Sequence, residues 1–110
     1  MTTLGPHRDE LALTVRGRPS RTHASQGEQR SLALALRLAA HRLVTERTGS
    51  PPVLVLDDVL SELDDHRSTA LLSHLPTGQI VMTTATDIPV AARVDRVLRV
   101  RDGVVTDETF

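Results

Sequence analysis

Apolar residues form two short continuous runs in the second half of this chain. Residues 53–57 read VLVLD, and an apolar run without alternation is typical of a strand buried on both faces of a parallel sheet. Residues 79–84 (QIVMTT) form a second run of this kind. Between them, residues 64–75 begin with acidic residues and end before the sequence PTG, which predicts a helix. The order strand, helix, strand predicts a βαβ unit.

A long helix is predicted over residues 25–47. Ser25 and Glu28 have the spacing of a capping box, in which each side chain bonds the backbone N–H of the other residue. The body, SLALALRLAAHRL, is rich in strong helix formers, and Gly49 with two following prolines predicts the end. Polar residues define a narrow stripe: Arg30, Arg37, His41 and Thr45. Since Leu and Ala fill most of the remaining circumference, we expect a largely buried helix whose polar stripe faces water.

The segment before this helix has a hairpin pattern. Residues 11–16 (LALTVR) alternate between apolar and polar, as in a strand with one solvated face. The sequence GRP predicts a turn, and residues 20–24 are expected to return from it.

A second hairpin is predicted near the other end of the chain. Asp102 and Gly103 lie between residues 96–101 and two valines, a combination that indicates a type I′ turn. Residues 88–93 are expected to form a short helix.

Composition narrows the class of protein. With 110 residues, 39% of them hydrophobic, the chain has the size of one small domain that can bury roughly 65% of its unfolded surface. The single aromatic residue is the final Phe, which excludes aromatic stacking on nucleic-acid bases. The lack of cysteine excludes disulfides and thiolate metal sites. No apolar run reaches the roughly 18 residues of a membrane span and no signal peptide is evident, so we expect a cytoplasmic protein without a membrane partner.

Charge and histidine spacing give weaker signals. A net charge of −1 does not predict nucleic-acid binding, and the cluster Arg16, Arg18 and Arg21 is interpreted as a solvated face in preference to a DNA contact. All 13 basic residues are arginines, so no lysine is available for a phosphate-binding GxxxxGK[ST] loop. No metal-binding spacing is present, and four histidines are expected at the surface or at caps: His23, His41, His66 and His74.

Two carboxylates, Asp57 and Asp58, end the first apolar run. Ligands bind outside the C-terminal ends of strands in open α/β sheets. There one carboxylate can hold a Mg²⁺ that bridges nucleotide phosphates, and the other can orient or deprotonate a water molecule. The alternative is that both residues cap the helix start that follows.

The start of the long helix is a second candidate site. Residues 24–30 read ASQGEQR, which places free N–H groups and the positive end of the helix dipole where a phosphate can bind. Gly27 lets the backbone approach closely, and Ser25 offers a hydroxyl. The alternative is a well-capped helix without a ligand.

In this order the motifs resemble the C-terminal half of an ABC-type ATPase head. SQGEQ corresponds to the signature motif, VLVLDD to Walker B, and SELD (residues 61–64) to the D-loop. Within these ATPases the chain is most similar to the RecF family, through GPHRDE at residues 5–10, the form SQGEQR, and LVLDDVLSELD. The resemblance runs from about residue 4 to residue 107.

The resemblance implies an α/β fold: the C-terminal part of a P-loop (ABC-type) ATPase head, with a mainly parallel sheet, flanking helices and a C-terminal β-hairpin. Residues 1–110 would form a single partial domain that lacks the Walker A portion. ATP and Mg²⁺ would therefore be cofactors of the complete head only. The isolated chain is expected to bind ATP poorly and to be inactive.

The resemblance also implies roles for individual residues. Asp57 would hold Mg²⁺, and Asp58 would be the catalytic residue in place of a longer Glu, which suggests slow hydrolysis with ATP acting as a clamp. Thr84 lies in the switch region, where transporter heads carry a His. The signature residues would touch the nucleotide held by the opposite subunit: Ser25, Gln26, Gly27 and Glu28. Ser61 and Asp64 would line the dimer interface.

At the level of function, the resemblance implies DNA replication and recombinational repair. An ATP-dependent homodimer would bind DNA at gaps and single-strand/double-strand junctions and would support recombinase loading with recombination mediator proteins. One alternative is an SMC-like, RecN-like or transporter head, which the GPHRDE element disfavours. Another is a non-catalytic, truncated fragment that binds a full-length head.

Overall fold

The computed structural model describes residues 11–109. The GPHRDE element lies outside the described residues. The chain divides into two compact units, Met1–Leu54 and Val55–Phe110, and each is described by itself. Within the described range, no helix has both the length and the apolar character required to cross a bilayer.

A small hairpin opens the first unit. Strand β1 (Thr14–Val15) pairs antiparallel with β2 (Arg18–Pro19). The turn between them is Arg16-Gly17, with φ of 52° and 76°, so both residues adopt the left-handed conformation that a type I′ turn requires. The predicted hairpin is confirmed, but its turn lies one residue earlier than expected, and residues 11–13 are not part of the strand.

The predicted return strand at residues 20–24 is wrong. These residues instead form the short helix α1 (Ser20–His23), which is preceded by Pro19 with φ −54°. The fixed φ of proline suits a helix start, and proline has no N–H with which to continue a strand ladder.

Helix α2 (Gln26–Thr48) begins and ends within one residue of the predicted limits. The Ser25 hydroxyl accepts a hydrogen bond from the Glu28 N–H, and the Glu28 carboxylate accepts one from the Ser25 N–H, both at 3.2 Å. At the other end Gly49 has φ 75°, and its N–H donates to the Thr45 carbonyl at 2.9 Å. Both the capping box and the glycine stop are therefore confirmed.

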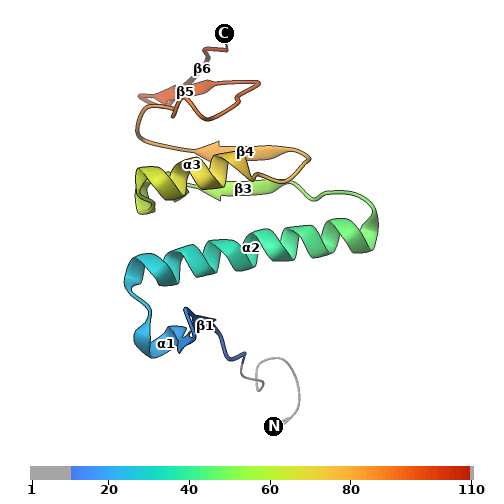
Figure 1. Ribbon diagram of the computed structural model, residues 1–110. Helices are drawn as coiled ribbons and strands as arrows, with labels where there is room; N and C mark the ends of the chain where they lie inside the picture. The colour runs from blue at the N-terminus through green and yellow to red at the C-terminus, as the bar shows by residue number, and fades with distance from the viewer. Residues whose placement is uncertain (1–10, 110) are drawn as a thin grey trace, which may run out of the picture. The chain divides into compact units, whose positions relative to one another are not determined.

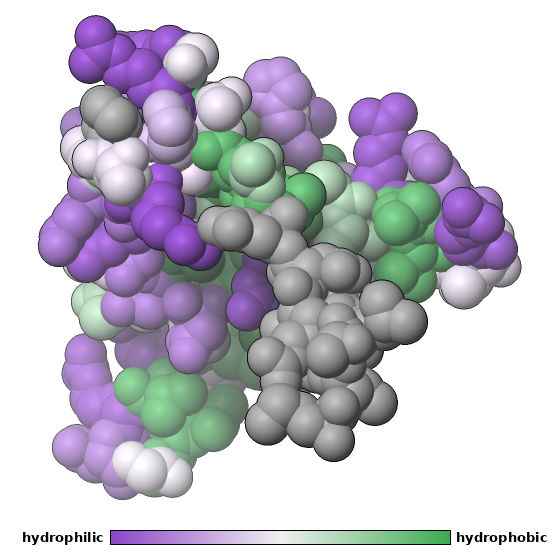
Figure 2. Space-filling model, turned by 90° about the horizontal axis from the view of Figure 1, so that it is seen from below, coloured by the Kyte–Doolittle hydropathy of each residue, from purple (hydrophilic) through white to green (hydrophobic). Residues whose placement is uncertain are grey.

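The expected burial of α2 is wrong. Leu36 and Leu43 are 41% and 54% exposed, and Figure 2 shows hydrophobic side chains at the surface between hydrophilic ones. By contrast His41, from the predicted polar stripe, is 7% exposed. Its Nε2 lies 2.8 Å from the Pro52 carbonyl oxygen, so the His41 ring contacts the segment that follows the helix. Burial depends on what packs against each face, which the periodicity of one helix does not specify.

A strand–helix–strand arrangement forms the second unit, starting from β3 (Leu54–Asp57). It continues through the 3₁₀ helix η1 (Val59–Glu62) and α3 (Asp65–Ser73) to β4 (Ile80–Thr83). β3 and β4 form a two-stranded sheet, and Figure 1 shows their arrows pointing the same way. The predicted βαβ order is confirmed.

Only one face of β3 is covered. Leu54 and Leu56 are 8% and 3% exposed, whereas Val53 and Val55 are 56% and 62% exposed. The expectation of a strand buried on both faces is therefore wrong for this chain. A doubly covered parallel strand needs packing elements on both sides of the sheet.

The second hairpin follows its sequence pattern. β5 (Leu98–Arg101) pairs antiparallel with β6 (Val104–Asp107). Asp102 and Gly103 have φ of 51° and 75°, which confirms the type I′ turn. The short helix expected at residues 88–93 is wrong: a single turn occurs there, closed by a 2.9 Å bond from the Ala92 N–H to the Pro89 carbonyl. A segment this short forms too few backbone hydrogen bonds to offset the entropy cost of nucleating a helix.

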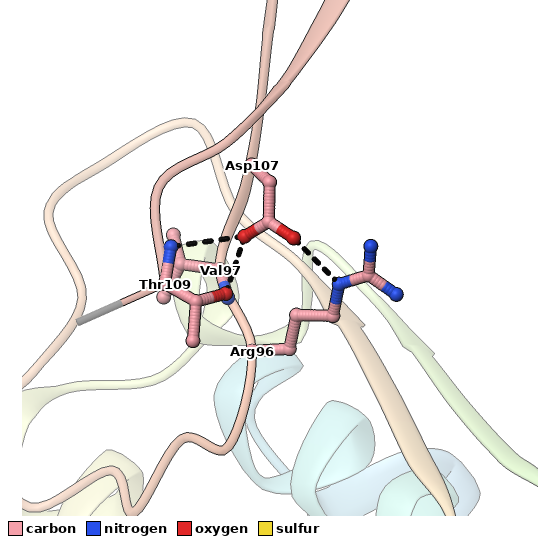
Figure 3. Close-up of polar contacts among 4 residues, drawn as sticks. All are labelled: Arg96, Val97, Asp107 and Thr109. Atoms are coloured by element: carbon pink, nitrogen blue, oxygen red, sulfur yellow. Dashed lines mark hydrogen bonds and ion pairs between the residues drawn. The ribbon is translucent and has the colours of Figure 1, made fainter.

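Asp107 ties the open end of this hairpin together (Figure 3). Its Oδ1 accepts from the Thr109 hydroxyl at 2.5 Å and from the Thr109 N–H at 3.0 Å, and its Oδ2 lies 3.0 Å from Arg96 Nε. These contacts hold the pKa of Asp107 below its ordinary value of 3.8, and the Thr109 hydroxyl makes the largest contribution. The same hydroxyl accepts the Val97 N–H at 3.1 Å.

We predict that Gly49→Ala destabilises the chain by roughly 1 kcal/mol, since an alanine is strained in the left-handed conformation. No atom lies within 4 Å of a Cβ placed there, so the cost comes from the backbone alone. Urea unfolding followed by helical circular dichroism measures the change. Gly49→Asn is the matched control, because asparagine tolerates this conformation. Equal stability of the Ala and wild-type chains would contradict the assignment.

We predict that acid weakens the base of the β5–β6 hairpin. A carboxylate whose pKa is lowered on folding contributes stability above its unfolded pKa and loses it as the pH falls through the folded value. The protection factors of the Val97 and Thr109 amides, relative to the intrinsic exchange rate at each pH, should therefore fall below about pH 3.8. Asp107→Asn should remove this acid-dependent step, and a step that persists in that variant would show that another group causes it.

Candidate functional site

The first turn of α2 presents unused backbone donors. Ser25 caps the Glu28 N–H, and the Gln29 N–H donates to the Ser25 carbonyl at 2.8 Å. The N–H groups of Gln26 and Gly27 make no hydrogen bond within residues 11–109. Two N–H groups at the positive end of a 23-residue helix can receive an anionic oxygen. The structure thus brings the four predicted signature residues into one turn.

The segment that leads into this turn is also anchored. The Gln29 side-chain amide donates to the carbonyl oxygens of Ser20 and Ala24, at 3.4 Å and 3.3 Å. The Ser31 hydroxyl donates to the Gly27 carbonyl at 2.9 Å. Side chains from the first two turns of the helix therefore hold the backbone on both sides of Ser25.

The second predicted group lies at the C-terminal end of β3. Asp57 is the last residue of the strand and is exposed. The Thr83 hydroxyl, at the end of the neighbouring strand β4, donates to Asp57 Oδ1 at 2.5 Å. The same hydroxyl oxygen accepts the Asp58 N–H at 3.0 Å, and the Thr83 carbonyl accepts it at 3.2 Å. One threonine therefore contacts both members of the acidic pair.

Asp58 has an uncommon backbone conformation for a residue other than glycine. Its φ and ψ are 53° and 30°, in the left-handed region that Asp and Asn adopt more readily than most residues. The Ser61 hydroxyl donates to the Asp58 carbonyl at 2.8 Å. The Asp58 carboxylate is exposed and has no hydrogen-bond partner in the described part of the chain. Such strained positions concentrate at functional sites.

The two predicted D-loop residues have local structural roles. Ser61 holds the Asp58 carbonyl, and Asp64 is the N-cap of α3, where its Oδ1 accepts the Arg67 N–H at 2.8 Å. These bonds do not test the predicted interface role of either residue. They show that the loop is shaped by the same side chains that the motif singles out.

Thr84, the predicted switch residue, bonds to its own turn. Its hydroxyl oxygen accepts the Thr86 N–H at 3.2 Å and lies 3.1 Å from the Thr86 hydroxyl. The residue that reaches Asp57 is Thr83, to which the sequence assigned no role. A signal was present, because Asp57 ends the first apolar run and Thr83 lies next to the end of the second.

A magnesium ion fits Asp57 only as part of a larger ligand set. No group of three His, Cys, Asp or Glu residues gathers within residues 11–109. Mg²⁺ is commonly held by one or two carboxylates together with waters and substrate phosphates, so a single exposed carboxylate at a strand end is compatible with it. This chain would supply one protein ligand.

Comparisons with curated proteins find DNA replication and repair proteins named RecF. The chain is 49% identical over 88 residues to the protein from Symbiobacterium thermophilum, covering 80% of the chain and 24% of that protein. It is 43% identical over 113 residues to the protein from Exiguobacterium sp., covering 99% of the chain and 30% of that protein. The chain thus spans about a quarter of the length of these relatives. No protein-family model matches the chain.

Comparisons with solved structures find the same group. One structure is described as the recombination mediator protein RecF-ATPrS in the RecFOR pathway; it has a TM-score of 0.68 and 37% identity, covering 98% of this chain and 29% of that chain. A structure of RecF-ATP matches with a TM-score of 0.67. These matches confirm the predicted fold class, part of a P-loop ATPase of the ABC type.

We predict that Asp58→Gly leaves the free energy of unfolding unchanged or raises it by up to about 1 kcal/mol, because glycine adopts the left-handed conformation without strain. Asp58→Val should lower it by about 1 kcal/mol, since a β-branched residue is disfavoured there. Urea unfolding of both variants tests this ordering. The reverse order would mean that the Asp58 side chain, and not its backbone, stabilises the fold.

Proposed function

Because this chain belongs to the RecF family over the part of RecF that it spans, we propose that it acts as the signature and Walker B portion of an ATP-dependent DNA replication and repair protein. The match to RecF structures described with ATP and ATPrS, over nearly the whole chain, is the observation that carries this proposal. The exposed apolar side chains on β3 and α2 support a chain that works together with further protein surface.

In this proposal the nucleotide is held between two subunits. The N–H groups of Gln26 and Gly27 and the hydroxyl of Ser25 would bind the γ-phosphate held by the opposite subunit. Glu28 would support this turn through the capping box that it forms with Ser25.

The acidic pair would act in the subunit's own site. Asp57 would hold Mg²⁺, which when bound neutralises charge on the phosphates. Asp58 would orient a water and accept its proton through the exposed carboxylate. Asp64 and Ser61 would lie at the dimer interface, and Thr84 would contribute to the switch region.

The biological role follows from the family. A homodimer clamped by ATP would bind DNA at gaps and single-strand/double-strand junctions in the cytoplasm. It would act with recombination mediator proteins to load a recombinase. The relatives' description as RecF, and of one as a recombination mediator in the RecFOR pathway, supports this role.

The test is an assembly experiment. The chain is mixed with a separately produced remainder of a RecF protein, and light scattering follows dimerisation with ATP and gapped DNA. We predict dimerisation with the wild-type chain and its loss with Ser25→Arg, because the larger, charged side chain would fill the space of the incoming phosphate. Binding of ATP by the monomeric assembly should not change.

Ser50→Arg is the matched control, since it adds the same charge at an exposed serine beyond the C-terminal end of α2. Unchanged dimerisation with Ser25→Arg would contradict the role of Ser25. ATP turnover by the isolated chain would contradict its dependence on a separate Walker A portion.

A further inference from the structure

Thr83 contacts the acidic pair in a way that suggests a defined task. Its hydroxyl has one hydrogen, which it donates to Asp57 Oδ1, and lone pairs, one of which accepts the Asp58 N–H. We propose that Thr83 is a positioning residue that orients the Asp57 carboxylate for Mg²⁺ and fixes the backbone of Asp58. This inference rests on the nucleotide-binding role proposed above and adds a residue to it.

The contact with Asp57 fixes the orientation of its carboxylate. A hydrogen bond to a charged oxygen is stronger and more directional than one between neutral groups. Because Thr83 donates to Oδ1 at 2.5 Å, one lone pair of that oxygen is used, and Oδ2 keeps both of its lone pairs for a metal ion or a metal-bound water. Within residues 11–109, Oδ2 has no hydrogen-bond partner.

The contact with Asp58 fixes the second carboxylate through its backbone. The Asp58 N–H is shared between the hydroxyl and the carbonyl oxygen of Thr83. On the other side of the residue, the Ser61 hydroxyl holds the carbonyl. With both peptide groups anchored, the left-handed backbone conformation of Asp58 is maintained.

Threonine is suited to this task for a physical reason. Its β-branched side chain has restricted rotation about χ1, so the hydroxyl keeps one direction. Serine retains the hydroxyl and loses this restriction, whereas valine retains the shape and loses the hydroxyl. The two substitutions therefore separate hydrogen bonding from packing.

The experiment measures the Mg²⁺ concentration that gives half-maximal ATP-dependent assembly of the chain with the RecF remainder. We expect Thr83→Val to raise it about tenfold or more, the usual effect of removing a group that orients a metal ligand. Thr83→Ser should stay within about threefold of wild type, and ATP binding without Mg²⁺ should be the same in all chains. Thr106→Val is the control, because it makes the same substitution on an exposed position of β6.

Two failures are distinguishable. If the wild-type chain does not assemble with ATP, the proposed function is overturned and the inference with it. If the wild type assembles and Thr83→Val shows the same Mg²⁺ dependence, the inference alone is overturned. Should Thr83→Val not fold, Thr83→Ala takes its place because it also removes the hydroxyl. A Mg²⁺ requirement raised more than threefold supports the proposal, and one within threefold of wild type overturns it.

Discussion

One threonine hydroxyl joins the ends of two neighbouring strands in this protein. Thr83 contacts the Asp57 carboxylate and the Asp58 N–H, and so links the side chain of one acidic residue to the backbone of the other. A parallel pair of strands places its C-terminal ends at one edge, so a side chain at the end of β4 can reach the end of β3 directly. The chemistry proposed for the acidic pair depends on this contact, because a metal ligand and a water-orienting carboxylate act only from fixed positions.

Several apolar side chains of this protein are left exposed on its strands and helices. Val53 and Val55 lie on the uncovered face of β3, and Leu43 of α2 is also exposed. Burial of apolar surface is worth about 25 cal/mol per Å², whereas ordering one residue costs about 1–2 kcal/mol of backbone entropy. Valines and leucines that stay exposed gain little of this burial energy.

Local signals were sufficient for the two ends of α2 and for the turn of the second hairpin. The capping box of Ser25 and Glu28, the stop at Gly49 and the turn at Asp102-Gly103 all depend on backbone conformations that nearby residues determine. Predictions that depended on distant packing were less successful. His41 was expected at the surface and is buried, and α2 was expected to be largely buried but exposes Leu36 and Leu43.

By itself, the sequence determined the strand–helix–strand order, both ends of α2, the tight turn at Asp102-Gly103 and the resemblance of its motifs to those of a nucleotide-binding family. Each of these depends on residues within a few positions of one another. Tertiary structure alone decided which face of each element is covered and which side chain meets Asp57. Those outcomes depend on strand pairing between residues 26 positions apart, and pairing register is set by the whole sheet and not by either strand.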